Sequence, residues 1–147
     1  MRFTAMMIVV SLLAGCGGTG GPGRAPLEKD VVPVNGTLTY QGQPLESFQI
    51  AFHPRDGKKP GTGVTDASGN FKLGTNNIAD GCPAGSCRVS VAFVAPANDG
   101  MGEIVDDPRK LPKPKVNVPA KYASPDTSEI MVDVPNSGLK DYKLDLK

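Results

Sequence analysis

The chain has 147 residues, with 16 Lys and Arg against 15 Asp and Glu, a single His, three Cys and no Trp. Because the charges nearly balance and no basic stripe is present, the composition lacks the usual footprint of a nucleic-acid-binding protein, and we expect neither a nucleic-acid partner nor a strongly charged substrate. Four lysines between residues 110 and 121 are separated by prolines and accompanied by acidic residues, which is typical of a solvated loop.

The first fifteen residues have the layout of an export signal. One positive charge at Arg2 precedes an apolar run that reaches Leu13 and is interrupted by Thr4 and Ser11. The run spans about a dozen residues, whereas a helix that crosses a bilayer needs about 20. We therefore predict that residues 1–15 are a signal peptide that is removed, and not a permanent membrane anchor.

The end of this run, Leu13-Ala14-Gly15-Cys16, resembles the lipobox of bacterial lipoproteins. In that family the cysteine receives a diacylglyceryl group and becomes the N-terminus after cleavage. The resemblance implies that Cys16 is the lipid attachment site and that the protein is exported and anchored to the cell envelope. Residue 17 is Gly and not Asp, which by the enterobacterial sorting rule implies the periplasmic side of the outer membrane. The alternative is an ordinary secretory leader with a cysteine at its cleavage site.

Residues 16–30 follow as a segment with almost nothing to bury. Gly occupies five of the seven positions from 17 to 23. Such a composition is typical of a flexible tether. The remaining residues, 31–147, suffice for one domain with a modest core.

Within residues 31–147, apolar and polar residues alternate with the period of half-buried strands, and helical spacing is nowhere sustained. The alternating positions lie near residues 32–40, 48–52, 64, 71–73, 89–93, 130–134 and 142–146. About seven short strands with turn residues between them are typical of an antiparallel sandwich such as the immunoglobulin-like fold. We therefore predict an all-β domain, a seven-stranded antiparallel β-sandwich.

Two of the connections contain the residues that tight turns require, at residues 41–44 and 66–70. On this basis we expect the first and second strands to form one hairpin, and the third and fourth strands to form another.

Several of these segments carry a second resemblance. Residues 34–38 (Val-Asn-Gly-Thr-Leu), 42–45 (Gly-Gln-Pro-Leu) and 65–71 (Thr-Asp-Ala-Ser-Gly-Asn-Phe) resemble the carboxypeptidase regulatory-like domain. Residues 83–91 and 118–128 resemble small lipoproteins of this type that are abundant in planctomycete bacteria. The resemblance covers most of the predicted domain and implies a transthyretin-like sandwich.

The matching motifs consist of turn and strand chemistry. They imply that Gly69 allows a tight turn, that Phe71 fills the core behind it and that Asp66 bonds backbone amides. They specify a fold and carry no reaction. One departure is Cys87, which stands where such sequences often have a tyrosine.

The pair Cys82 and Cys87 lies after the predicted export signal, in a compartment where disulfides persist. We expect a disulfide between them. A redox-active pair is favoured by a tighter two-residue spacing and by a helix N-terminus that lowers the thiol pKa, and neither is visible here. A zinc site needs three or four ligands, whereas the mature domain offers two thiols and one histidine.

Residues suited to catalysis are scarce. The only histidine, His53, falls on the outer face of a strand whose inner face holds Phe52. Nucleophilic catalysis needs a nucleophile, a base and an orienting group together, and the only paired carboxylates are sequence neighbours at residues 106 and 107. A calcium loop from Asp66 would need Gly and Glu where the chain has Phe71 and Asn77. We expect no enzyme activity, no metal site and no cofactor.

Residues 95–121 contain five prolines and are too long for an ordinary hairpin loop, so they form either a functional loop or a variable insertion. Next to them, Tyr122 lies in a proline-flanked segment and is a candidate contact for a partner. The sequence therefore predicts a non-catalytic envelope lipoprotein, a structural or protein-interaction module whose partners are the membrane, through Cys16, and an unknown envelope protein or glycan. The alternative is a module that binds a glycan or small ligand through residues 95–122.

Overall fold

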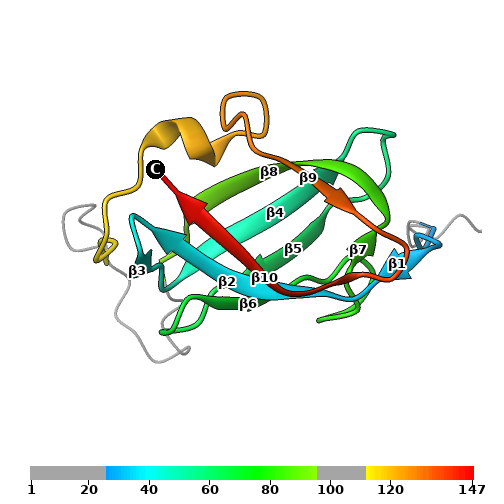
Figure 1. Ribbon diagram of the computed structural model, residues 1–147, viewed down its shortest axis with the longest axis horizontal. Coiled ribbons are helices and arrows are strands. Elements are labelled where there is room, and N and C mark those ends of the chain that lie inside the picture. The colour runs from blue at the N-terminus through cyan, green and yellow to red at the C-terminus, as the bar shows by residue number, and fades with distance from the viewer. Residues whose placement is uncertain (1–25, 96–111) are drawn as a thin grey trace, which may run out of the picture.

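A computed structural model describes residues 26–95 and 112–147 (Figure 1). The predicted signal peptide, Cys16, the first part of the predicted tether and residues 96–111 lie outside the described residues. In the described residues the chain forms β-strands and one short 3-10 helix, with no α-helix. The elements are β1 (Val31–Val32), β2 (Val34–Tyr40), β3 (Gln43–Pro44), β4 (Phe48–Pro54), β5 (Gly61–Val64), β6 (Asn70–Lys72), β7 (Cys82–Pro83), β8 (Gly85–Phe93), η2 (Ala120–Ala123), β9 (Met131–Val134) and β10 (Leu139–Leu146).

The predicted all-β class is confirmed. The strands longer than two residues are β2, β4, β5, β6, β8, β9 and β10, and they lie at the seven predicted positions. All but β5 bury alternating apolar residues, and β5 has glycines at the inward-facing positions. On β2, for example, Val34 and Leu38 are buried while Asn35 and Thr37 between them are half-exposed. The strands form because this alternation lets each one bury a face without burying polar side chains.

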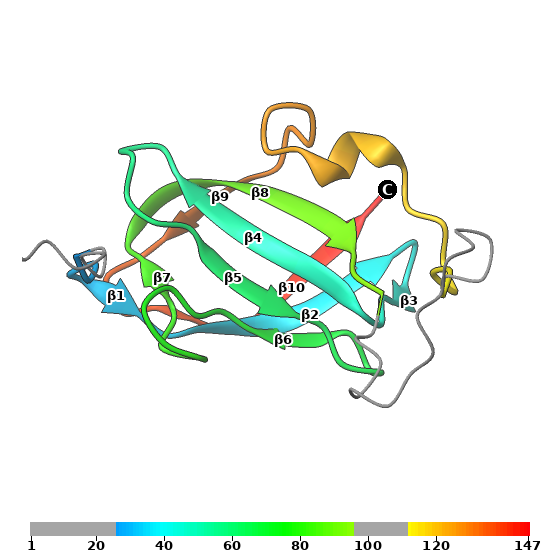
Figure 2. The same ribbon diagram turned by 180° about the vertical axis from the view of Figure 1, so that it is seen from behind.

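The strands pair into two four-stranded sheets and one two-stranded sheet. One large sheet has the order β5-β4-β8-β9 and is antiparallel throughout. In the other, β2 is central and pairs with β10, β3 and β6. The small sheet joins β1 to β7. Figures 1 and 2 show the two large sheets stacked on one another, with β5 and β6 side by side.

The prediction of antiparallel pairing throughout is wrong at one place, because β10 pairs with β2 in parallel. After β9 the chain turns at residues 135–138, where the Gly138 amide donates to the Pro135 carbonyl at 2.9 Å. The Leu139 amide then donates to the Pro33 carbonyl at 3.0 Å, so β10 starts beside the beginning of β2 and runs in the same direction. The chain changes sheets at this turn, and a hairpin ladder between β9 and β10 does not form.

The two predicted hairpins are also not continuous ladders. β2 pairs with β3 over two residues only, and the chain then enters the other sheet as β4. The turn at residues 66–70 forms as expected, but β5 pairs with β4 and β6 pairs with β2. A single bridge between Thr62 and Gly74 links the two arms. The turn at residues 66–70 therefore connects the two sheets, whereas the chain changes sheets only after β3 in the first case.

The turn at residues 66–70 has the chemistry implied by its sequence. One carboxylate oxygen of Asp66 accepts from the backbone amides of Ser68 and Asn70, both at 2.9 Å. Gly69 has a φ of +77°, and a Cβ there would lie 2.5 Å from the Leu38 carbonyl oxygen. Phe71 follows and is buried. The turn is thus fixed by its own side chain and by close backbone packing.

One hydrophobic core lies between the two large sheets. Its fully buried members include Leu38 from one sheet, Ile50, Phe52 and Val89 from the other, and Leu45 from the crossing between them. The same cluster includes both cysteines of the domain and Tyr122. Both sheets therefore depend on a single core for their stability. Within residues 26–95 and 112–147, the fold contains no helix with the length and apolar character needed to cross a membrane.

The last part of the segment predicted as a tether is held against the domain. The side chain of Asn76 donates to the Glu28 carbonyl at 2.9 Å and accepts from the Glu28 amide at 2.8 Å. Lys59 donates from its backbone amide to the Glu28 carboxylate at 3.2 Å and from its side chain to the Pro26 carbonyl. Residues 26–30 thus lead into β1 along a fixed path, at the right-hand end of the domain in Figure 1.

Candidate functional site

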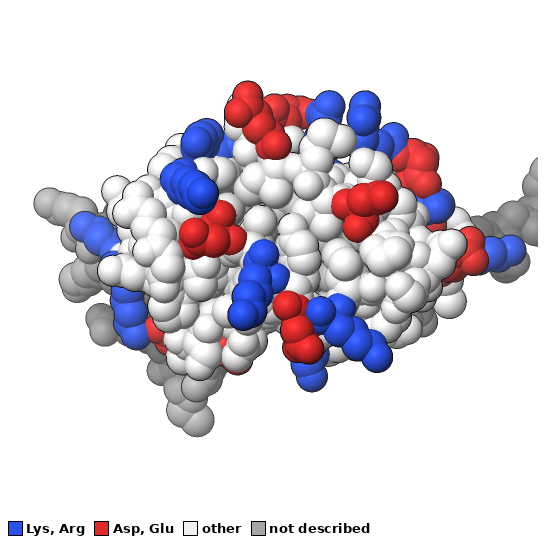
Figure 3. All heavy atoms as spheres, viewed as in Figure 1, with Lys and Arg blue, Asp and Glu red and all other residues white. Residues whose placement is uncertain are grey.

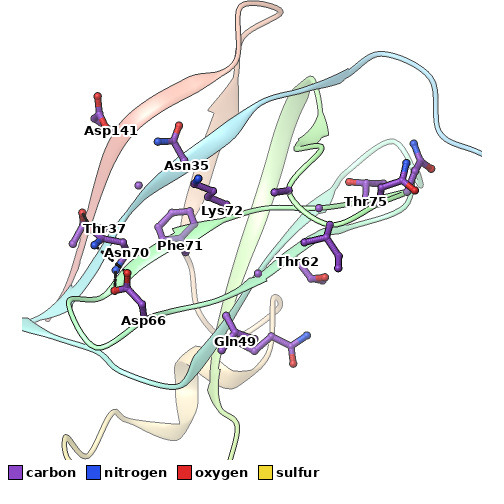
Figure 4. Close-up of a pocket in the computed structure, with 18 residues that line it drawn as sticks. Asn35, Thr37, Gln49, Thr62, Asp66, Asn70, Phe71, Lys72, Thr75 and Asp141 are labelled. Carbon is purple, nitrogen blue, oxygen red and sulfur yellow. Dashed lines mark hydrogen bonds between the residues drawn. The ribbon is translucent and has the colours of Figure 1, made fainter. Parts of the chain in front are cut away.

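A groove of about 1020 Å³ crosses the outer surface where β5 and β6 meet (Figure 4). Its floor is formed by outward-facing residues of β2, β4, β5 and β6, and its wall by the loop of residues 74–79. The floor carries polar side chains because residues opposite the core face the groove, and Val64 adds an exposed apolar side chain to it. We call this concavity the β5–β6 groove.

The floor is built from cross-strand neighbours. Asn35 pairs with Lys72 and Thr37 with Asn70 across β2 and β6. The Thr37 hydroxyl donates to the Asn70 side chain at 3.1 Å. On the other side of the groove, Gln49 of β4 pairs with Val64 of β5. Val64 was expected among the buried strand residues, but 56% of it is exposed, because the glycines at 61 and 63 occupy the inward-facing positions of β5.

The wall of the groove is a loop held by one carboxylate. Asp80 accepts from three successive backbone amides, at 2.7 Å from Thr75, 3.1 Å from Asn76 and 2.9 Å from Asn77. The Thr75 hydroxyl also donates to the Gly81 carbonyl at 2.9 Å. These bonds fix the loop while leaving Ile78 entirely exposed. An apolar side chain is therefore held in water on a well-supported loop.

The groove carries little charge and few titratable groups. Its ionisable lining residues are Asp66, Lys72 and Asp141. The Asp66 carboxylate is occupied by its own turn, and the amide hydrogen bond from Asn70 lowers its pKa below the usual range. The lining includes no His or Cys. Figure 3 shows acidic and basic side chains interspersed over the face in view, with no large patch of one sign. The groove is arranged for uncharged hydrogen bonding.

The position of the groove differs from the predicted ligand site. The sequence placed the alternative binding site at residues 95–122, whereas the groove is lined by residues between 35 and 79 and by Asp141. Residues 96–111 lie outside the described residues, so the role of that loop stays a prediction. The missed signal was the polar run at residues 75–77 followed directly by Ile78, an isoleucine with no place in a strand or core pattern.

The sequence predicts Tyr122 as a candidate contact for a partner, and in the structure this residue is buried, with only 5% of it exposed. The short helix η2 packs against β8 and turns the tyrosine ring into the core. The Tyr122 hydroxyl donates to the Lys147 carbonyl and accepts from the Lys147 amide at 3.3 Å. The side chain ties the C-terminus to the domain and offers little surface to a partner.

His53 lies half-buried on β4, and its Nε2 is 2.9 Å from the Ser90 hydroxyl. Neither residue lines the β5–β6 groove. In the described part of the chain no carboxylate is hydrogen-bonded to this histidine, so the contact lacks the third, orienting group of a catalytic triad. The described residues also contain no cluster of three or more His, Cys, Asp or Glu side chains that could hold a metal ion.

Cys82 and Cys87 are brought together in the core. Both are fully buried, and both are thiols in the structure. A hydrogen bond between the two side chains raises the pKa of Cys82, together with burial, and lowers the pKa of Cys87. Gly61 makes room for the pair, since a Cβ there would lie 2.7 Å from Cys82 Cβ. The thiols are neighbours, and the disulfide between them stays a prediction.

We expect protein isolated from the cell envelope to contain the Cys82–Cys87 bond. Trypsin should release residues 73–88 as one peptide, because no Lys or Arg interrupts it before Arg88. After denaturation and alkylation without reduction, this peptide should lack two hydrogens and carry no alkyl group. Reduction of the bond should lower the unfolding free energy by about 2 kcal/mol through the entropy of the unfolded chain. A peptide alkylated twice before reduction would show that the thiols stay free.

Comparisons of the chain with protein-family models, with curated proteins and with solved structures found no match.

Proposed function

We propose that this protein is a non-catalytic lipoprotein of the bacterial cell envelope whose transthyretin-like β-sandwich serves as an interaction module. The observation that carries the proposal is the motif at residues 13–16, where a short apolar run ends in Leu-Ala-Gly-Cys. The apolar run before Cys16 is too short to span a bilayer, so a stable anchor would have to come from lipid on Cys16. Two or more acyl chains on Cys16 would give stable membrane attachment, which a single chain does not.

The arrangement of the N-terminal segment supports a tethered module. Residues 26–30 are hydrogen-bonded to the loops around Lys59 and Asn76, and they lead into β1. The chain from Cys16 therefore reaches the domain at a defined point beside the wall of the β5–β6 groove. A lipid at Cys16 would hold the domain near the membrane and leave the groove on a folded, pre-organised surface.

The chemistry of the described surface supports binding over catalysis. The β5–β6 groove is lined mainly by amide, hydroxyl and glycine groups, with three ionisable side chains. General acid–base catalysis needs positioned groups that exchange protons near the working pH. Asp66, whose carboxylate is occupied and whose pKa is lowered, is not such a group.

The anchor is tested by growing cells with labelled palmitate. Wild-type protein should incorporate the label and sediment with membranes, whereas Cys16→Ser should do neither. Gly17→Ser is the matched control, because it changes the neighbouring residue and keeps the thiol; it should behave as the wild type. Equal labelling of wild type and Cys16→Ser would overturn the lipoprotein assignment.

A further inference from the structure

The side chain of Ile78 is 100% exposed on a loop that Asp80 holds through three backbone amides. A single exposed hydrophobic residue is common on protein surfaces. Here, however, Ile78 lines the same groove as Val64, which is 56% exposed. Because the loop is already ordered, a ligand that covers Ile78 would not have to order it on binding. The two residues form a pre-organised apolar contact at the groove.

Around this contact the groove offers unused amides. The side chains of Asn35, Gln49 and Asn77 line it and form no hydrogen bond with another residue of the described segments. Each such amide provides two donors and one acceptor oxygen. Figure 4 shows Asn35 and Gln49 on opposite sides of the groove. A ligand lying between them could receive and donate hydrogen bonds along both of its edges.

The neighbouring Asn76 shows which chemistry these amides suit. Its Nδ2 donates to the Glu28 carbonyl at 2.9 Å while its Oδ1 accepts from the Glu28 amide at 2.8 Å. The Asn76 side chain thus already holds the backbone of one residue, Glu28, through both of its polar groups. The side-chain amides of Asn35, Gln49 and Asn77 have the same donor and acceptor groups and can form the same pair of hydrogen bonds with a peptide backbone.

Other classes of ligand fit the groove less well. Phe71 is the only aromatic residue of the lining, and it is 3% exposed, so no ring is available for a sugar to stack on. The charged lining residues are few and of both signs. The volume of about 1020 Å³ lies at the upper limit of pockets that hold drug-sized molecules, roughly 300–1,000 Å³. An uncharged polypeptide in extended form needs no aromatic ring to stack on and no charged partner, and it suits a groove of this volume.

We propose that the β5–β6 groove binds an extended, uncharged polypeptide segment of a partner protein. The amides of Asn35, Gln49 and Asn77 bond its backbone, and Ile78 and Val64 contact its apolar side chains. When extended peptides add to a sheet edge, bonds to the peptide backbone give affinity and side-chain contacts give specificity; here side-chain amides would supply the bonds to the peptide backbone. This inference deepens the proposed interaction function by naming its site and the class of its partner.

The test uses the whole chain with Cys16→Ser, which removes the lipid and leaves the groove intact. A phage-displayed library of random heptapeptides is selected on this protein, and the enriched peptides are synthesised and titrated by NMR. Enriched peptides should be uncharged and should shift amide signals of residues 35, 49, 64 and 74–79. Ile78→Asp should weaken their binding at least about tenfold, or 1.4 kcal/mol.

Met131→Asp is the matched control for the groove substitution. Met131 is as exposed as Val64, at 56% each, but it lies on β9 and outside the groove lining. Binding should be unchanged in this variant. Three outcomes would overturn the proposal. The first is no enrichment of peptides relative to a selection on the Ile78→Asp variant, the second is enrichment of charged peptides, and the third is NMR signal shifts outside the groove. A tetrasaccharide of N-acetylglucosamine that binds the groove when no peptide does would also overturn it. These outcomes do not depend on lipidation, so they are distinguishable from failure of the palmitate experiment.

Discussion

Replacing Gly36 by alanine should destabilise the domain by about 3 kcal/mol. A Cβ at this position would lie 2.0 Å from the main-chain oxygen of Tyr142 and 2.8 Å from its carbonyl carbon. Both atoms belong to the backbone of β10, which pairs with β2 in parallel at this point. Because no side-chain rotation can relieve such a contact, the two strands would have to separate. The midpoint and slope of urea unfolding would give the change in free energy.

The comparison variant is Lys143→Ala, one residue further along β10. Lys143 is exposed and pairs with Thr37, so its removal should change the unfolding free energy by no more than about 0.5 kcal/mol. If Gly36→Ala were as stable as the wild type, β10 could not lie beside β2 in this register. The pair of variants therefore tests the parallel pairing of β10 with β2, where the prediction of antiparallel pairing is wrong.

The strands themselves could be predicted because their signal is local. In β4 the alternation of Phe48, Ile50 and Phe52 with Gln49 already specifies which face is buried, and the structure buries those three residues. The turn at 66–70 was equally readable, since the Asp66 carboxylate bonds amides only two and four residues away. Features determined by near neighbours are visible in the sequence.

Strand pairing was not readable, because it depends on which faces meet across the whole domain. Turn residues at 41–44 and 66–70 predict that the chain reverses, and it does. They do not say whether the next strand stays in the same sheet. In the order β5-β4-β8-β9, the pairs β4–β8 and β8–β9 join strands separated by long stretches of sequence, and burial of a shared core favours these pairings. Loop closure costs little more for a distant partner than for a near one.

The β5–β6 groove was missed for the same reason. Asn35, Gln49 and Ile78 are far apart in the sequence, and each alone is an ordinary surface residue. Their common site arises because β5 pairs with β4 while β6 pairs with β2, which brings the outer faces of both sheets together at one seam. A polar strand face becomes a candidate site only when its neighbours are known.

Tyr122 should prove to be a core residue when it is replaced. Truncation to alanine removes a ring that is 5% exposed and should cost about 3–5 kcal/mol of unfolding free energy, as for other buried aromatic residues. Tyr122→Phe keeps the ring but loses the two hydrogen bonds to Lys147, and it should cost about 1 kcal/mol.

The ratio of these two effects distinguishes packing from surface contact. A tyrosine on the surface would lose no more than about 0.5 kcal/mol in either variant, and its replacement would instead weaken binding of a partner. In the structure, Lys121 covers the ring with its ammonium group 4.7 Å from the centroid, and the core covers the rest. Denaturant unfolding of both variants and the wild type would therefore decide the role of Tyr122. A large loss of unfolding free energy for Tyr122→Ala with a small loss for Tyr122→Phe shows a core residue. Negligible losses for both variants would show a surface residue.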